Sequence, residues 1–240
     1  MLCPPPLPPL PPPPLQLNEN LWKAFNTNYV QNESVFVNNA NSLSVDLSKL
    51  TFAKGANSLD VFFINEGAGY RNQLTFSGGS YNNQMIFDDI SSKDSVVKES
   101  NGKLKLGQGF SFTGGLKAGD AVDFTLISNK RSNYTFGTNM ATNVDGLQHA
   151  IGYEYFDGTD NWLILGFEDL YGDLKAQGTD SKTGLKNEGS DRDFNDVVVA
   201  LRGVSTREFS SQAVPEPGMM LGLAGAAAVG VLRRRQVAKV

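Results

Sequence analysis

Short runs of apolar residues recur through the middle of the chain, separated by clusters of Gly, Asn, Ser and Asp. Some runs alternate apolar and polar positions, as in Val122-Asp123-Phe124-Thr125-Leu126, a pattern typical of a strand with one face in water. Asn-Gly, Gly-Gly and Asp-Gly pairs between the runs favour turns. The pattern predicts strands at Leu59–Ile64, Gln84–Phe87, Lys103–Leu106, Val122–Ile127, Ala150–Phe156, Trp162–Phe167 and Val197–Leu201.

Helical periodicity is limited to a turn or two around Leu21–Phe25. Hydrophobic residues make up 40% of the chain, which is enough for a core and excludes a wholly disordered protein. Short strands repeated over about 200 residues predict an all-β fold, a single antiparallel β-sandwich or jelly-roll-like domain.

The distribution of proline predicts the domain limits. Nine of the 11 prolines lie between Pro4 and Pro14, and the other two are Pro215 and Pro217. We therefore expect a proline-rich leader at 1–17, a β-sandwich domain at 18–213 and a short tail at 214–240. The leader should form an extended polyproline II rod, and indicates a stiff spacer or a start codon assigned at the wrong position. It lacks the basic and apolar regions of an export signal.

Charge and composition exclude several function classes. Four of the 21 basic residues and none of the 25 acidic ones lie after Pro217, so residues 1–217 have a net charge of −8. An acidic body without a Lys/Arg run offers no electrostatic footprint for nucleic acid. One cysteine, Cys3, and one histidine, His149, exclude a disulfide framework and Cys/His zinc sites. Any metal site must therefore use oxygen ligands.

Acidic residues concentrate beside two of the predicted strands. Glu168 and Asp169 follow the strand that ends at Phe167, and Asp191–Asp196 lead into the strand that begins at Val197. If these strands pair as a hairpin, both acidic groups meet at the same end of a sheet. The candidate metal ligands are Glu168, Asp169, Asp191, Asp193, Asn195 and Asp196.

Carboxylates gathered in this way repel one another unless they are protonated, dispersed or neutralised by a cation. Calcium accepts six to eight oxygen ligands in a loose geometry, so the sequence predicts a structural calcium ion. The alternative is a solvated acidic loop. Asp191-x-Asp193-x-Asn195 has the spacing that begins an EF-hand loop, but Asp196 and Arg202 stand at the glycine and glutamate positions. A strand also follows instead of a helix, so the segment is no EF-hand.

The tail combines three features in a fixed order. Val214-Pro215-Glu216-Pro217 precedes an apolar, small-residue stretch at 218–232, and Arg233-Arg234-Arg235 follows it. The apolar stretch would span about 22 Å as a helix, against about 30 Å of membrane hydrocarbon. In motif, order and position the tail resembles the PEP-CTERM sorting signal.

That resemblance implies a secreted or cell-envelope protein that its tail first anchors in the inner membrane. It also implies cleavage near Pro215–Pro217 by an exosortase-type membrane protease, and an association with exopolysaccharide and biofilm matrix. Such proteins need an N-terminal export signal, so we expect the true start to lie upstream.

A second resemblance concerns the acidic residues. Phe167-Glu168-Asp169-Leu170 together with the sequence DRDFNDVV at 191–198 resembles a bacterial domain of unknown function, number 4114, as do residues 62–72 and 149–155. We expect the likeness to extend over 55–203 and to be strongest in 148–201. The family occurs in secreted and adhesin-like bacterial chains, and both calcium binding and enzymatic activity have been suggested for it.

Two functions therefore remain open. The first is a calcium-stabilised adhesion, binding or structural module, in which Arg71, Asn72, Tyr155 and Trp162 could contact a polysaccharide. The alternative is a carboxylate-dependent glycoside hydrolase acting on matrix polysaccharide, with Glu168 as acid and Asp193 or Asp196 as nucleophile or base. Because acid–base catalysis needs two carboxyl groups with different pKa values, the crowding of acids favours the non-enzymatic module.

Overall fold

The protein is described by a computed structural model, which covers residues 14–31, 34–35, 42–96, 101–128 and 134–206. The chain divides into two units, Met1–Arg207 and Glu208–Val240. The proline-rich leader up to residue 13 and the predicted sorting tail lie outside the described residues.

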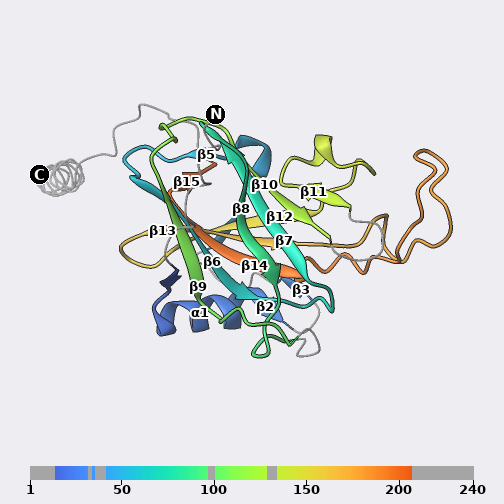
Figure 1. The fold of residues 1–240 in the computed structure, drawn as a ribbon, viewed down its shortest axis with the longest axis horizontal. Coiled ribbons are helices and arrows are strands. Elements are labelled where there is room, and N and C mark those ends of the chain that lie inside the picture. Colours follow the sequence, from blue (N-terminus) through green and yellow to red (C-terminus); the bar gives the residue numbers. More distant parts are fainter. Residues whose placement is uncertain (1–13, 32–33, 36–41, 97–100, 129–133, 207–240) are drawn as a thin grey trace, which may run out of the picture. The chain divides into compact units, whose positions relative to one another are not determined.

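Two large antiparallel sheets make up most of the described part of the first unit (Figure 1). The larger sheet has the order β1 (Leu15–Gln16), β9 (Gln108–Thr113), β6 (Ser58–Asn65), β14 (Val197–Arg202), β13 (Asn161–Phe167), β12 (Ala150–Phe156) and β4 (Ser42–Ser44). The smaller has the order β11 (Thr135–Gly137), β10 (Val122–Ile127), β7 (Asn72–Gly78) and β8 (Tyr81–Ile90).

The remaining described elements are short, apart from one helix. There are two further two-stranded sheets: β5 (Thr51–Phe52) pairs with β15 (Val204–Ser205), and β2 (Val30–Gln31) pairs with β3 (Ser34–Val35). The helices are α1 (Glu19–Tyr29) and the 3-10 turns η1 (Leu47–Lys49) and η3 (Met140–Thr142).

The main core lies between the two sheets. Phe63 of β6 and Val199 of β14 belong to the same buried cluster as Phe76 of β7 and Phe124 of β10. Because alternate residues of a strand point to opposite faces, each sheet contributes one apolar face to this core. The packing confirms the predicted all-β, antiparallel sandwich.

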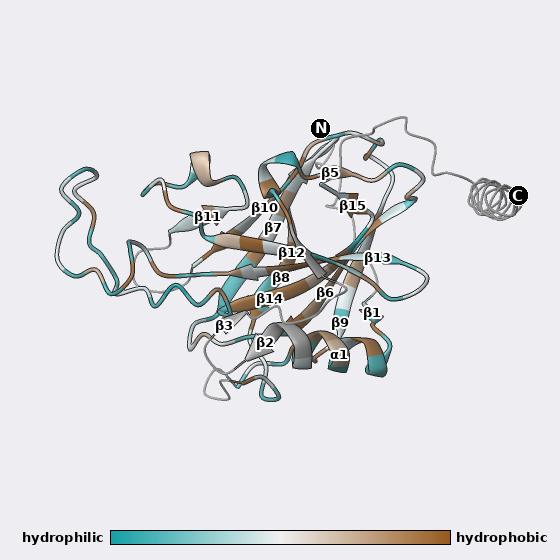
Figure 2. Cartoon of the chain, turned by 180° about the vertical axis from the view of Figure 1, so that it is seen from behind, coloured by the Kyte–Doolittle hydropathy of each residue, from teal (hydrophilic) through white to brown (hydrophobic). Residues whose placement is uncertain are grey.

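Helix α1 covers the other face of the larger sheet (Figure 2). Phe25 of the helix packs on Trp162 of β13, with ring centroids 5.5 Å apart, and on Tyr155 of β12. Strands β6, β13 and β14 are therefore buried on both faces, which explains their continuous apolar runs. The alternation predicted for Val122–Leu126 is found in β10, whose residues are alternately buried and half-buried. The sequence indicated only a turn or two of this helix.

One predicted strand is wrong. Lys103 makes only an isolated bridge to Ser92, and the strand that joins the larger sheet there is β9, five residues later. The sequence of β9 gives a weak strand signal because it contains Gly109 in place of an apolar residue. Glycine is required there, since a Cβ at Gly109 would lie 2.3 Å from the carbonyl oxygen of Val61. The other predicted strands are present.

Truncating Phe25 tests the role of α1. The Phe25→Ala variant should lose about 3–5 kcal/mol of unfolding free energy, because a buried ring is replaced by a cavity. Phe156→Ala is the control, since its ring is 51% exposed and should cost less than about 1 kcal/mol. Denaturant titration of both variants measures the difference, and equal losses would contradict the packing of α1 on the sheet.

Candidate metal centre

The β13–β14 hairpin brings the acidic residues together. The two strands pair antiparallel, with Phe167 opposite Val197, so the chain leaves and re-enters the sheet at the same end of these strands. This end is called the acidic edge below. Glu168 and Asp169 follow directly after β13, and Asp196 directly precedes β14. The hairpin predicted from the sequence is confirmed.

Three carboxylates at this edge converge on one another. Glu168, Asp193 and Asp196 each offer one oxygen atom, and these atoms all lie within 4.8 Å of one another. Backbone N–H groups also hold one oxygen of each carboxylate. Leu170 N donates to Glu168 Oε1 (3.2 Å), Asn195 N to Asp193 Oδ1 (3.1 Å) and Asp169 N to Asp196 Oδ2 (2.7 Å). The loop backbone thus orients the cluster.

Glu168 is the most deeply placed member of this cluster. Its side chain is fully buried, and its Oε2 atom has no hydrogen-bond partner among the described residues. No described lysine or arginine forms an ion pair with Glu168 or Asp196. Leu170 N compensates only the Oε1 atom, and burying the charge of a carboxylate without full compensation is costly, so a proton or a cation would stabilise Oε2.

The electrostatics of the cluster reflect this crowding. Burial, with the charges of Asp191 and Asp169, raises the pKa of Glu168 to about 7, although hydrogen bonds with Ser190 and the Leu170 backbone act in the opposite direction. Burial also raises the pKa of Asp196 well above its usual range, together with the charges of Asp169 and Glu168. Both shifts have the sign expected when anionic groups share a poorly solvated site.

A second layer of contacts fixes the acidic edge to neighbouring strands. Asn72, at the start of β7, donates through Nδ2 to Asp169 Oδ2 at 2.7 Å. Gly67 N donates to the carbonyl oxygen of Asn195 at 2.9 Å. A Cβ at Gly67 would lie only 2.0 Å from Asn195 Oδ1, so this close approach requires glycine.

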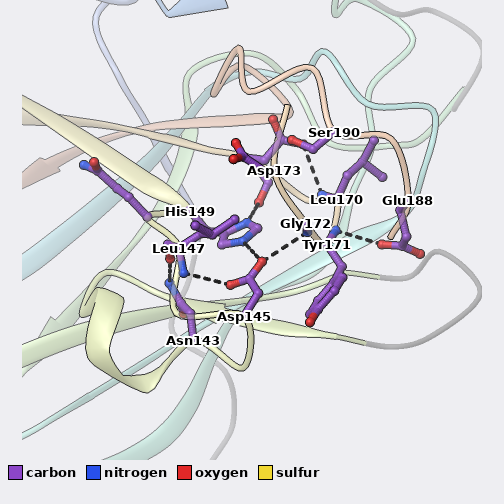
Figure 3. Close-up of polar contacts among 12 residues, drawn as sticks. Asn143, Asp145, Leu147, His149, Leu170, Tyr171, Gly172, Asp173, Glu188 and Ser190 are labelled. Atoms are coloured by element: carbon purple, nitrogen blue, oxygen red, sulfur yellow. Dashed lines mark hydrogen bonds and ion pairs between the residues drawn. The ribbon is translucent and has the colours of Figure 1, made fainter. Parts of the chain in front are cut away.

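Asp145 and His149 support the other side of the site (Figure 3). His149 Nδ1 lies 3.1 Å from the carbonyl oxygen of Glu168, and its Nε2 lies 2.8 Å from Asp145 Oδ2. Gly172 N donates to the same Asp145 oxygen at 3.1 Å. Burial alone would raise the pKa of Asp145, but hydrogen bonds, chiefly that with His149, lower it to about 2. The pair fixes the backbone of Glu168.

The sequence contains little signal for this pair. Asp145-Gly146 indicated only a turn, and the single histidine served only to exclude a Cys/His zinc site. What marks His149 as structural is its burial, together with Phe136 stacked on its ring at 3.8 Å, which only the fold supplies.

The loop at 191–196 has an unusual backbone. Arg192 and Phe194 adopt positive φ values of 57° and 58°, a left-handed conformation that costs about 1–2 kcal/mol for residues with a side chain. The Arg192 guanidinium lies over the Phe194 ring, 5.0 Å from its centroid, and donates to the carbonyl oxygen of Gln148. Asp193, between these residues, joins the cluster, whereas Asp191 is exposed.

The sugar-binding residues suggested by the sequence do not form one surface. Trp162 is 3% exposed beneath α1 and lies at the far end of β13 from Glu168, so its ring cannot stack on a sugar. Tyr155 packs edge-on against Phe25, and Asn72 is buried against Asp169. Arg71 is exposed but forms an ion pair with Asp89 at 2.7 Å.

Comparisons with known proteins identify two segments. Residues 116–204 match the family described as a domain of unknown function (DUF4114), and residues 213–236 match the PEP-CTERM protein-sorting motif. Both predicted resemblances are confirmed, although the first match begins at residue 116 and excludes residues 62–72. No curated protein and no solved structure matches the chain.

The sorting motif supports an exported protein that an exosortase-type enzyme processes at its tail. Within the described residues, no helix is long and apolar enough to cross a membrane. The motif itself, including Val214–Pro217 and Arg233–Arg235, lies outside those residues.

Adding a methyl group at Gly67 should disrupt the acidic edge. Gly67→Ala should lower the unfolding free energy by about 1–3 kcal/mol, because the new Cβ overlaps Asn195. Gly69→Ala is the matched control, since nothing lies within 4 Å of a Cβ there. Thermal melts compare the two variants, and an intact Gly67→Ala protein would show that the approach to Asn195 is not tight.

Stability should fall with rising pH when divalent cations are chelated. The pKa of Glu168 is about 7 in the fold against 4.5 in a free chain, so the folded state binds the extra proton between these values. Unfolding free energy should therefore drop by up to about 3 kcal/mol from pH 5 to pH 8.

Urea titrations in chelator at both pH values measure this drop. This window avoids the titration of Asp145, whose pKa is about 2. The Glu168→Gln variant should lose the part of the pH dependence that comes from Glu168, while Asp196, whose pKa is also raised, keeps a contribution of the same sign. An unchanged slope in that variant would assign the whole effect to other groups.

Proposed function

We propose that this protein is an exported module in which one calcium ion stabilises the long loop between β13 and β14. The observation that carries the proposal is Glu168, whose Oε2 atom is buried without a hydrogen-bond partner among the described residues and whose carboxylate belongs to a cluster of three. A divalent cation would satisfy this oxygen and neutralise the repulsion at once.

The ligand atoms suit calcium in kind and spacing. Calcium–oxygen distances of about 2.3–2.6 Å allow two ligand oxygens to lie up to about 5 Å apart, and the three oxygens here lie within 4.8 Å. Glu168, Asp193 and Asp196 would hold the ion, and calcium tolerates water in its remaining positions. Hard carboxylate oxygens without sulfur or imidazole ligands disfavour zinc and copper.

The burial of Glu168 supports a structural ion. Glu168 is fully buried, so a macromolecular ligand has no direct access to it. Calcium would instead fix the loop at 168–196 to the sheet. Together with the sorting motif, this supports a role as an adhesion, binding or structural module in the cell envelope or extracellular matrix, with an extracellular polysaccharide as its ligand.

The glycoside hydrolase alternative has less support from the same geometry. The raised pKa of Glu168 suits a general acid, but a general acid must reach the glycosidic oxygen of its substrate. Full burial of Glu168 leaves no room for a sugar beside it. Release of reducing sugar from a polysaccharide, abolished in Glu168→Gln, would favour this alternative.

Calcium should raise the thermal stability of the full chain at neutral pH. A hundredfold excess over the dissociation constant should add about 2.7 kcal/mol to the unfolding free energy. The Asp193→Asn variant should lose most of this gain, because it removes a ligand charge.

Asp88→Asn is the matched control for this experiment, since Asp88 is an exposed carboxylate on β8 and the same charge is lost. Melts with calcium and with chelator measure the gain for each protein. Equal melting temperatures for the wild-type chain with and without calcium would reject the site.

A further inference from the structure

A groove lies beside α1, and its lining shares no residue with the acidic cluster. Its volume of about 680 Å³ falls within the range of about 300–1,000 Å³ found for ligand sites. Residues that line it include Trp22, Lys93, Lys103, Leu104, Lys105 and Leu106.

The groove concentrates positive charge on an acidic protein. Lys93, Lys103 and Lys105 are exposed, and their side chains have no ion-pair partner among the described residues. Asp94 is the single acidic residue of the described lining, whereas residues 1–217 have a net charge of −8. Such a local excess of one sign attracts ligands of the opposite charge.

Hydrogen bonds hold this charged rim in place. Lys103 pairs with Ser92 in an isolated bridge, and Leu104 N donates to the carbonyl oxygen of Ser91 at 3.1 Å. Ser92 N in turn donates to Oε2 of the buried Glu66 at 3.0 Å. The two backbone segments that carry the lysines are therefore fixed relative to each other.

The groove also has an apolar wall. Trp22 rests on Gly107, where a Cβ would lie 2.9 Å from Cδ1 of the indole, so the ring has a defined position. Leu104 and Leu106 are half-buried and pack against the main core. An indole beside amine groups can contact the apolar C–H face of a sugar ring while the lysines bind its charged substituents.

We propose that this groove binds an anionic oligosaccharide, a short chain of sugars that bear carboxylate groups. A phosphate-rich ligand fits less well, because the described lining contains no arginine for bidentate contacts. The net charge of −8 also repels the dense charge of nucleic acid. The proposal goes beyond the calcium site and does not depend on it.

The test measures binding of a fluorescent galacturonate hexasaccharide to the full chain at low salt. Binding is measured with calcium and again with chelator, so that neither association of the sugar with calcium nor loss of the proposed structural ion is taken for a property of the groove. The Lys103→Gln/Lys105→Gln double variant should bind about tenfold more weakly. The Lys117→Gln/Lys182→Gln variant, which removes two exposed lysines elsewhere, should bind like the wild type. Trp22→Phe keeps an aromatic ring in the fold and should weaken binding less than Trp22→Ala.

Competition and salt show whether the groove selects a charged sugar. A neutral glucan hexasaccharide should not compete, and added sodium chloride should weaken binding. Equal binding by the two double variants would overturn the proposal, as would the absence of any binding at low salt. Stronger competition by a single-stranded oligonucleotide than by the sugar would also overturn it. None of these results bears on the calcium melts, which use a different site and different variants.

Discussion

The pairing of β13 with β14 is the constraint on which the rest of the structure depends. Both strands lie in the middle of the larger sheet and are buried on both faces, so their position and register are strongly specified. This pairing places Phe167 opposite Val197 and brings the two acidic ends of a long loop together at the same end of the strands. Apolar burial in the core stabilises this pairing. The carboxylates are therefore held close together although they repel one another.

The loop itself is stabilised mainly by its own polar groups. Tyr171 N donates to Glu188 Oε2, and the Tyr171 hydroxyl donates to Asp180. These two hydrogen bonds connect the two arms of the loop. Asp145 ties the same loop, through Gly172, to the turn before β12. These contacts satisfy the side chains of Glu188 and Asp180. They do not reach the Glu168 Oε2 atom, which is buried without a hydrogen-bond partner among the described residues, and this supports a cation at that point.

The sequence predicted those strands that a single signal, an apolar run bounded by turn residues, was sufficient to reveal. Strands β6, β10, β12, β13 and β14 have apolar runs bounded by turn residues, and the acidic groups beside β13 and β14 required only their pairing to meet. Strand β7 has few apolar residues, and β9 has a glycine at its closest approach to β6, so neither shows a run. Helix α1 covers a sheet face with Phe25, but its polar residues mask the helical period.

The candidate site was predictable in its location but not in its details. Spacing placed Glu168, Asp193 and Asp196 together, but it could not show that Asp191 turns into solvent or that Asn195 packs on Gly67. Those outcomes depend on the left-handed residues Arg192 and Phe194, and on a strand distant in sequence. Trp162 was misjudged for a similar reason, since only the fold reveals the helix above it.

The central claim is that a calcium ion lies among the three carboxylates at the end of the β13–β14 hairpin. Anomalous diffraction from crystals of the protein grown in calcium tests this most directly. We predict an anomalous peak that lies about 2.3–2.6 Å from oxygen atoms of Glu168, Asp193 and Asp196. A map without a peak, in which these side chains point apart into water, would contradict it.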